Sequence, residues 1–256
     1  MTPSIWDPVA EPAVPMKEEF QITIPFNVYS ASAVSTARRY VTLVAEQISQ
    51  AHAKERNEAL QEYREISNPD EADYDVVVRS VDRDYEEEFF PMLYLTSVVY
   101  LYMVFETYVS RHITEIQRFF EMDSEILNRL KTKNKCGLVE ATQIFFKDHA
   151  KITFFTDDQW FQLKEIAHVR HCIVHDAGIP RDSTKNREFI YILEKRIWRD
   201  QPVGLHIDRY QGRDLGCPMN LNQRFLEYCL SVIEEFFDAL GSAAEGKFKE
   251  SGPQNP

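Results

Sequence analysis

The amino-acid sequence predicts an all-α protein, a helical bundle with a small β-ribbon inserted before its last helix. Three observations predict this class. Apolar residues recur at three- and four-residue steps through most of the chain, the spacing of a buried helical face. Glycine is scarce, with 8 in 256 residues, which disfavours folds rich in tight turns. One stretch, 89–109, is apolar almost all round, so we expect it at the centre of the bundle.

Composition is typical of a soluble globular protein, with 44% hydrophobic and 27% charged residues. The N-terminus lacks the basic and apolar regions of a secretory signal. No C-x-x-C pair occurs among the four cysteines (Cys136, Cys172, Cys217 and Cys229), which is typical of reduced thiols. The 89–109 run is interrupted by polar residues and favours a bundle helix over a membrane span. We therefore expect a cytoplasmic protein without membrane contact.

The N-terminal third divides into two predicted regions. Residues 1–32 contain five prolines and form an extended Pro-rich arm, with strand character at 20–25. Residues 33–88 comprise an N-terminal helix over 33–66 and an acidic linker. Beyond Ala51 this helix is charged, so its far half should project into solvent or meet a partner. The segment 67–75 is predicted as a loop, and 75–88 as a short strand or a linker.

Residues 89–241 form the predicted bundle. Helices are expected over 90–120, from 124 to about 135, and over 138–150, 160–178 and 221–240, with Gly241 ending the last of them. The segments 188–198 and 203–210 have strand-like composition and form the predicted ribbon. Its cations either bind a phosphate-bearing ligand or form a solvated face, and the second is the default: Lys195, Arg196, Arg199, Arg209 and Arg213. Residues 242–256 are predicted to be a disordered tail.

The net charge of −12 is unevenly distributed. Residues 55–90 contain 13 Asp/Glu and 4 Arg, a local charge of −9, whereas residues 160–218 contain 10 Lys/Arg and 8 Asp/Glu, a local charge of +2. The acidity therefore lies mostly outside the 160–178 helix. An acidic chain of this kind is compatible with a phosphate-bearing substrate.

The 160–178 helix has an explicit start and stop. Thr156 and Gln159 have the spacing of a capping box, and Gly178 is suited to a left-handed stop. When its positions are placed at about 100° per residue, Arg170 falls near the middle of the apolar face. Val174 and Ala177 fall on the same face, whereas Glu165 and Cys172 fall on or near the polar one.

A guanidinium on an apolar face must reach a carboxylate, a cavity or a subunit interface. Glu106, the single carboxylate of the 89–109 run, is the partner that we expect for Arg170. Such a pair could equally be a buried ion pair that has a structural role and takes no part in catalysis.

Three histidines share one edge of this helix: His168, His171 and His175. They could be a polar surface edge, and His171 and His175 have the i,i+4 spacing that can share Zn²⁺. The chain contains no H-E-x-x-H motif and no third ligand at a recognisable spacing. We therefore expect no metal and no cofactor.

The run Arg170-His171-Cys172-Ile173-Val174-His175 resembles the R-x4-H motif of HEPN domains (higher eukaryotes and prokaryotes nucleotide-binding). The context L-x-x-I-x-x-V-R-H-x-I-V-H-x-x-G, the earlier apolar helix with one Glu, and the final amphipathic helix extend the resemblance over about 90–240. His171 stands where that family more often has Asn.

The resemblance implies a helical bundle that dimerises so that two R-x4-H motifs face each other. It also implies a metal-independent endoribonuclease, often a toxin or antiviral defence effector that is controlled by an antitoxin or regulatory protein. Imidazoles suit this chemistry, since they can act as base toward a 2′-OH or as acid toward the leaving 5′-oxygen. A guanidinium stabilises charge on the phosphorane. The expected catalytic residues are Arg170, His175 and His171, with Glu106 and His168 in support.

Arg170 and His175 lie about 140° apart on one helix, so one protomer presents both to one phosphate only awkwardly. The sequence therefore favours a homodimer acting on RNA. Two alternatives stay open: a non-catalytic HEPN-like module that binds a nucleotide or a protein, and an unrelated helical interaction protein in which the motif is accidental.

Overall fold

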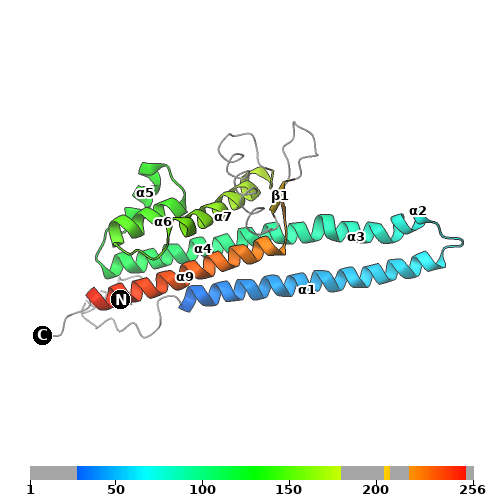
Figure 1. The fold of residues 1–256 in the computed structure, drawn as a ribbon, viewed down its shortest axis with the longest axis horizontal. Coiled ribbons are helices and arrows are strands. Elements are labelled where there is room, and N and C mark those ends of the chain that lie inside the picture. Colours follow the sequence, from blue (N-terminus) through cyan, green and yellow to red (C-terminus); the bar gives the residue numbers. More distant parts are fainter. Residues whose placement is uncertain (1–27, 180–204, 208–218, 252–256) are drawn as a thin grey trace, which may run out of the picture.

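The computed structural model describes residues 28–179, 205–207 and 219–251, and these residues are mostly helical (Figure 1). The predicted all-α class is confirmed. The first helix, α1 (Val28–Glu65), begins five residues earlier than predicted, so the last residues assigned to the arm are helical. The 20–25 and 188–198 segments lie outside the described residues.

A long antiparallel hairpin dominates the shape (Figure 1). After the loop that follows α1, the chain returns through one nearly continuous helical run. This run comprises α2 (Glu71–Tyr74), the π-helical turn η1 (Asp75–Arg79), α3 (Ser80–Asp84), a second π-helical turn η2 (Tyr85–Phe89) and α4 (Phe90–Phe119). A capping box starts it, since Asp70 and Asp73 exchange side-chain-to-backbone hydrogen bonds of 2.9 and 3.0 Å.

The prediction of a strand or linker over 75–88 was wrong, because this segment is helical. Its acidic side chains find partners on the charged half of α1. Asp82 accepts hydrogen bonds from Arg56 and pairs with His52 at 2.8 Å, and the Tyr85 hydroxyl donates to Glu55 at 2.9 Å. These contacts across the hairpin, with Val78 fully buried, outweigh the strand propensity of the valines. The far half of α1 therefore pairs with 71–89.

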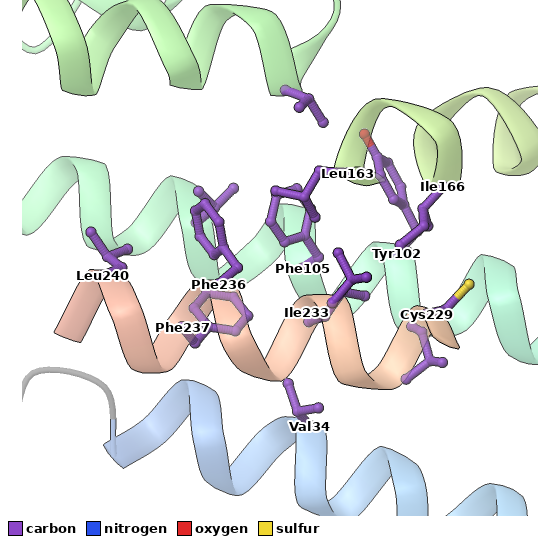
Figure 2. Close-up of a cluster of buried hydrophobic side chains, with 14 of the residues drawn as sticks. Val34, Tyr102, Phe105, Leu163, Ile166, Cys229, Ile233, Phe236, Phe237 and Leu240 are labelled. Atoms are coloured by element: carbon purple, nitrogen blue, oxygen red, sulfur yellow. The ribbon is translucent and has the colours of Figure 1, made fainter. Parts of the chain in front are cut away.

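The hydrophobic core lies between α1, α4, α7 (Asp157–Asp176) and α9 (Gln223–Ser251). Figure 2 shows Phe105 of α4, Leu163 and Ile166 of α7, and Phe236 and Phe237 of α9 meeting there. Phe236 is fully buried, and its ring centroid lies 5.2 Å from Phe105 and 5.7 Å from Trp160. Aromatic contacts of this kind fix α7 against α4 and α9.

A lobe of short elements covers the far end of α4: α5 (Ile126–Asn134), α6 (Leu138–Ile144) and a third π-helical turn, η3 (Phe145–Ala150). They agree with the predicted helices over 124–135 and 138–150. Two short strands, β1 (Leu205–Ile207) and β2 (Met219–Leu221), pair antiparallel before α9. The first falls within the predicted strand 203–210, whereas β2 includes Leu221, where the last helix was expected to begin.

Helix α9 runs through Gly241 to Ser251, so the prediction that Gly241 ends it was wrong, and 242–251 is not a disordered tail. A mid-helix glycine costs about 1 kcal/mol. Burial of Ala244 and Phe248 on the far side offsets this cost, and the Phe248 ring lies 4.3 Å from that of Phe119.

By length and composition alone, the run Glu71–Phe119 is the one helix of the described ranges that could cross a membrane. Its most apolar 18-residue window has a mean hydropathy of 1.4, and 33% of that window is buried in the bundle. The core helix of a soluble bundle meets the same criterion. Cytoplasmic localisation therefore stays a prediction.

Candidate functional site

Helix α7 carries the candidate site, and both of its ends are well defined. The capping box predicted from Thr156 and Gln159 is confirmed, with Thr156 Oγ1 accepting from the Gln159 amide at 3.3 Å. At the other end Ala177 and Gly178 both have left-handed backbone, and the Gly178 amide donates to the Cys172 carbonyl at 3.1 Å.

The end of α7 is also tied to the ribbon. The Met219 amide of β2 donates to the Gly178 carbonyl at 2.9 Å. Gly178 itself is buried, and a Cβ there would lie 3.8 Å from Leu95 of α4. The last turn of α7, which carries His175, therefore has a fixed position against α4 and β2.

Arg170 faces α4, and its expected partner is present. Arg170 Nη2 lies 3.9 Å from Glu106 Oε2, and the guanidinium carbon lies 5.6 Å from the centre of the Tyr102 ring. This separation is an ion pair rather than a hydrogen bond. Arg170 Nε is buried and has no hydrogen-bond acceptor among the described residues.

The prediction that Arg170 sits in the middle of the buried face was wrong. Its side chain is 24% exposed and that of Glu106 is 35% exposed, so the pair lies at the margin of the α4–α7 contact. Val174 and Ala177, which were expected on the buried face, are exposed. The buried face is rotated toward Val169 and Cys172, because α7 packs on both α4 and α9.

Glu165 and Cys172, which were expected on the polar face, are fully buried. The Tyr228 hydroxyl of α9 donates to Glu165 Oε2 at 2.9 Å, which supplies a partner for the buried carboxylate. Burial raises the pKa of the Cys172 thiol to about 12, so this cysteine is not a nucleophile at neutral pH. A signal was present in the sequence, since Trp160, Leu163, Ile166, Val169 and Cys172 recur at three-residue steps.

His171 and His175 are exposed and adjacent, with ring centroids 4.5 Å apart. His168, one turn earlier, is half-buried. These three imidazoles occupy one edge of α7, and Arg170 leans away from them toward Glu106. The structure therefore brings Arg170 to Glu106 and His171 to His175, and no hydrogen bond or ion pair among the described residues joins the two pairs.

No group of three His, Cys, Asp or Glu side chains with metal-binding geometry occurs in the part of the chain that the structure describes. The His171–His175 pair has the spacing for two ligands, and no third ligand lies beside it there. The cations predicted on the ribbon, from Lys195 to Arg213, lie outside the described residues.

Comparison with known proteins gives no relative: no family model, curated protein or solved structure matches this chain.

Proposed function

We propose that the protein is a metal-independent endoribonuclease of HEPN type, active as a homodimer and acting as a toxin or defence effector in the cytoplasm. The observation that carries this proposal is the exposed His171–His175 pair at the ordered end of α7, one residue from an arginine held over α4. Imidazoles in water-accessible positions can exchange protons with a substrate, and the guanidinium can bind its phosphate.

The proposed reaction needs no group beyond those of the chain and the RNA. A neutral imidazole removes the proton of a ribose 2′-OH, the 2′-oxygen bonds to the adjacent phosphorus, and the bond from phosphorus to the 5′-oxygen breaks. A protonated imidazole then supplies a proton to that leaving oxygen. The products are a 2′,3′-cyclic phosphate and a 5′-hydroxyl end. Arg170 would stabilise the negative charge on the phosphorane.

The separation of Arg170 from His175 supports a site built from two copies. In this arrangement Arg170 of one protomer and His175 of the other act on the same phosphate. Glu106 would keep the Arg170 guanidinium at the edge of α4, and His168 would support the histidine pair from the turn before it.

Exposed apolar side chains on the helices beside the motif support the same dimer. Tyr40 of α1 packs edge-to-face on Tyr100 of α4 at 5.9 Å, and both rings are largely exposed. Large apolar side chains are exposed on α1, α4 and α7: Tyr40, Leu43, Met92, Tyr100, Met103 and Val174. Such surfaces mark protein contacts more often than free solvent faces, and a second copy seated here would lie beside Arg170.

The deciding experiment measures cleavage of RNA in the presence of EDTA. Wild type should be active, and His175→Ala should lose at least about 100-fold in rate, the usual contribution of an acid–base group. Val76→Ala is the control, because Val76 is 72% exposed on η1, away from both the motif and the proposed dimer face. Retention of activity by His171→Asn would agree with the residue common in the family. An activity that EDTA abolishes would contradict the proposal.

A mixing experiment tests the composite site. Arg170→Ala and His175→Ala should each be inactive alone, but a mixed dimer contains one complete site. After subunit exchange at equal concentrations, about a quarter of wild-type activity should return, because half of the dimers are mixed and each has one of its two sites intact. No recovery in dimers shown to have exchanged would refute a site shared between protomers.

The dimer face has its own test. Met103→Glu should give a monomer in analytical ultracentrifugation and lose cleavage, since it places a charge in the proposed interface. Val76→Glu is the control, because Val76 is 72% exposed on the hairpin and away from that face. A wild-type monomer, or a Met103→Glu dimer, would contradict the assignment.

The second candidate is a non-catalytic module that binds a nucleotide or a protein partner. The projecting acidic hairpin favours it, since this part of the molecule contributes little to the bundle core (Figure 1). A folded dimer that binds a partner through the hairpin but cleaves no RNA would replace the first proposal with this one.

A further inference from the structure

Charge is unevenly distributed among the described elements. Residues 126–151, which form α5, α6 and η3, contain six Lys/Arg and two Asp/Glu, a local charge of +4 in a chain of net charge −12. Figure 1 places this lobe at one end of the molecule and the acidic hairpin at the other. The overall acidity therefore conceals one locally basic segment, residues 126–151.

The lysines of the lobe form no ion pair with the other residues that the structure describes. Lys131, Lys133, Lys135, Lys147 and Lys151 have no carboxylate within ion-pair distance among the described residues, and four of them are exposed and Lys131 is half-buried. In the hairpin, by contrast, Arg56 pairs with Asp82 at 3.0 Å and Arg79 with Asp75 at 2.7 Å. Carboxylates are present in and beside the lobe, at Glu140, Asp148 and Asp123, but the one ion pair that they form there is that of Asp123 with Arg129, among the described residues.

The basic lobe continues directly into the histidine edge of α7. Gln143 lies on α6 and Lys147 on η3, and Lys151 is the left-handed residue that ends η3. Lys164 of α7 donates from Nζ to Gln143 Oε1 at 3.0 Å, so the two edges meet at this contact.

From Lys164 the same edge of α7 presents His168, His171 and His175 at steps of four, three and four residues. The distance along the axis from Lys164 to His175 is about 16 Å, from 1.5 Å per residue. A line of groups that are cationic or can become cationic therefore runs from the lobe to the candidate site.

We propose that this edge, formed by Lys147, Lys151, Lys164, His168, His171 and His175, is the track that binds the sugar–phosphate backbone of single-stranded RNA and leads it to the histidine pair. The assignment rests on the proposed ribonuclease function and names its substrate-binding surface. Single charges spaced along one edge suit a flexible polyanion whose affinity comes from phosphate contacts.

Helix dipoles do not account for this pattern. Lysines are favoured in the last turn of a helix, which would explain Lys131 and Lys133 of α5. Lys164, however, lies in the N-terminal half of α7, where the dipole gives a cation no advantage. The line also ends at His171 and His175, which is the reason that RNA, rather than an acidic protein, is the proposed ligand.

The test is binding of a fluorescent 12-nucleotide single-stranded RNA with 2′-O-methyl groups, which cannot be cleaved, measured by anisotropy in EDTA from 50 to 200 mM KCl. The variant is Lys147→Gln, Lys151→Gln and Lys164→Gln combined. The control combines Lys54→Gln, Arg64→Gln and Lys249→Gln, which removes the same charge from exposed positions elsewhere. Circular dichroism establishes that both variants are folded.

The track variant should bind roughly tenfold or more weakly than wild type. The slope of log affinity against log salt should fall by about 2, because each lysine that neutralises a phosphate contributes about 0.7 to that slope. The control should keep the wild-type slope. Equal slopes in the two variants, with His175-dependent cleavage intact, would overturn the track and leave the ribonuclease standing. A wild type that neither binds nor cleaves RNA would overturn both, as would binding of acidic peptides in place of RNA.

Discussion

The substitution Arg170→Met tests whether the guanidinium stabilises the fold or serves catalysis. Two contacts hold the guanidinium: the 3.9 Å ion pair with Glu106 and the face of Tyr102 at 5.6 Å. At 3.9 Å two unit charges attract by about 1 kcal/mol in water and about 4 kcal/mol at an effective dielectric constant of 20. Both side chains are partly exposed, at 24% and 35%, so solvent and side-chain entropy should reduce the net value to about 0.5–1 kcal/mol.

The cation–π contact adds about 0.5–1 kcal/mol at a site of this exposure. Against these gains stands the buried Nε without an acceptor, an unsatisfied donor that costs about 1–3 kcal/mol. The cost is as large as the sum of the gains. Arg170→Met, which fills a similar volume with apolar atoms, should therefore change the free energy of unfolding by less than about 1 kcal/mol, or increase it.

The assay is urea unfolding at one fixed protein concentration for wild type, Arg170→Met, Glu106→Gln and the double variant, with cleavage rates measured on the same preparations. The double-mutant cycle should give a coupling of about 0.5–1 kcal/mol between Arg170 and Glu106. Cleavage by Arg170→Met should fall at least about 100-fold despite the retained stability.

Two results would refute this reasoning. If Arg170→Met lowered the free energy of unfolding by about 3 kcal/mol or more, Arg170 would be a structural residue with a much stronger contact than the geometry supports. A coupling of zero would show that Arg170 and Glu106 do not interact in solution.

Three further predictions concern the scaffold that holds α7. Phe236→Ala should destabilise the fold by about 3–5 kcal/mol, because it empties a fully buried site among aromatic rings, whereas Phe89→Ala, at a 49% exposed ring, should cost about 1 kcal/mol or less in urea unfolding. Thr156→Ala should cost about 1 kcal/mol through loss of the capping box, and Thr153→Ala, at an exposed position before the helix, should cost less than half of that. Burial, with Arg111 beside it, lowers the pKa of His112 to about 4. Between pH 6.5 and 4 the unfolded chain therefore binds more protons than the folded chain. The resulting stabilisation of the fold, about 3 kcal/mol, should be present above pH 6.5 and should be lost as the pH falls to 4. The difference in stability between wild type and His112→Gln should shrink by about that amount across this window, and a constant difference would contradict the assignment.

Much of the helical arrangement could be predicted from local signals. The ends of α7 follow from Thr156, Gln159 and Gly178, residues that satisfy backbone groups within one turn of themselves. Helix α4 follows from a run too apolar to be exposed along its whole length. The partner of Arg170 followed from the same reasoning, since Glu106 is the single carboxylate of that run.

The errors share one physical cause, which is contact between segments distant in sequence. The 75–88 segment looks strand-like or linker-like by itself, and it is helical because Asp82 and Tyr85 meet His52 and Glu55 thirty residues away. Gly241 looks like a helix stop, and the helix passes it because Phe248 packs on Phe119. Local propensity is worth about 1 kcal/mol per residue, and burial of one large side chain exceeds that.

The candidate site divides in the same way. The sequence by itself determined which groups are present, their order on one helix and the angle of about 140° between Arg170 and His175, because helical geometry is set by the backbone alone. Only the tertiary structure decided which way the helix is turned: Glu165 and Cys172 are buried, Val174 is exposed, and Arg170 lies at the margin of the core. The rotation of α7 about its axis depends on where α4 and α9 pack against it. The same rotation places Lys164 within hydrogen-bond distance of Gln143 in the basic lobe. A single helix cannot encode the position of its neighbours, whose packing is decided by the summed burial of all four bundle helices.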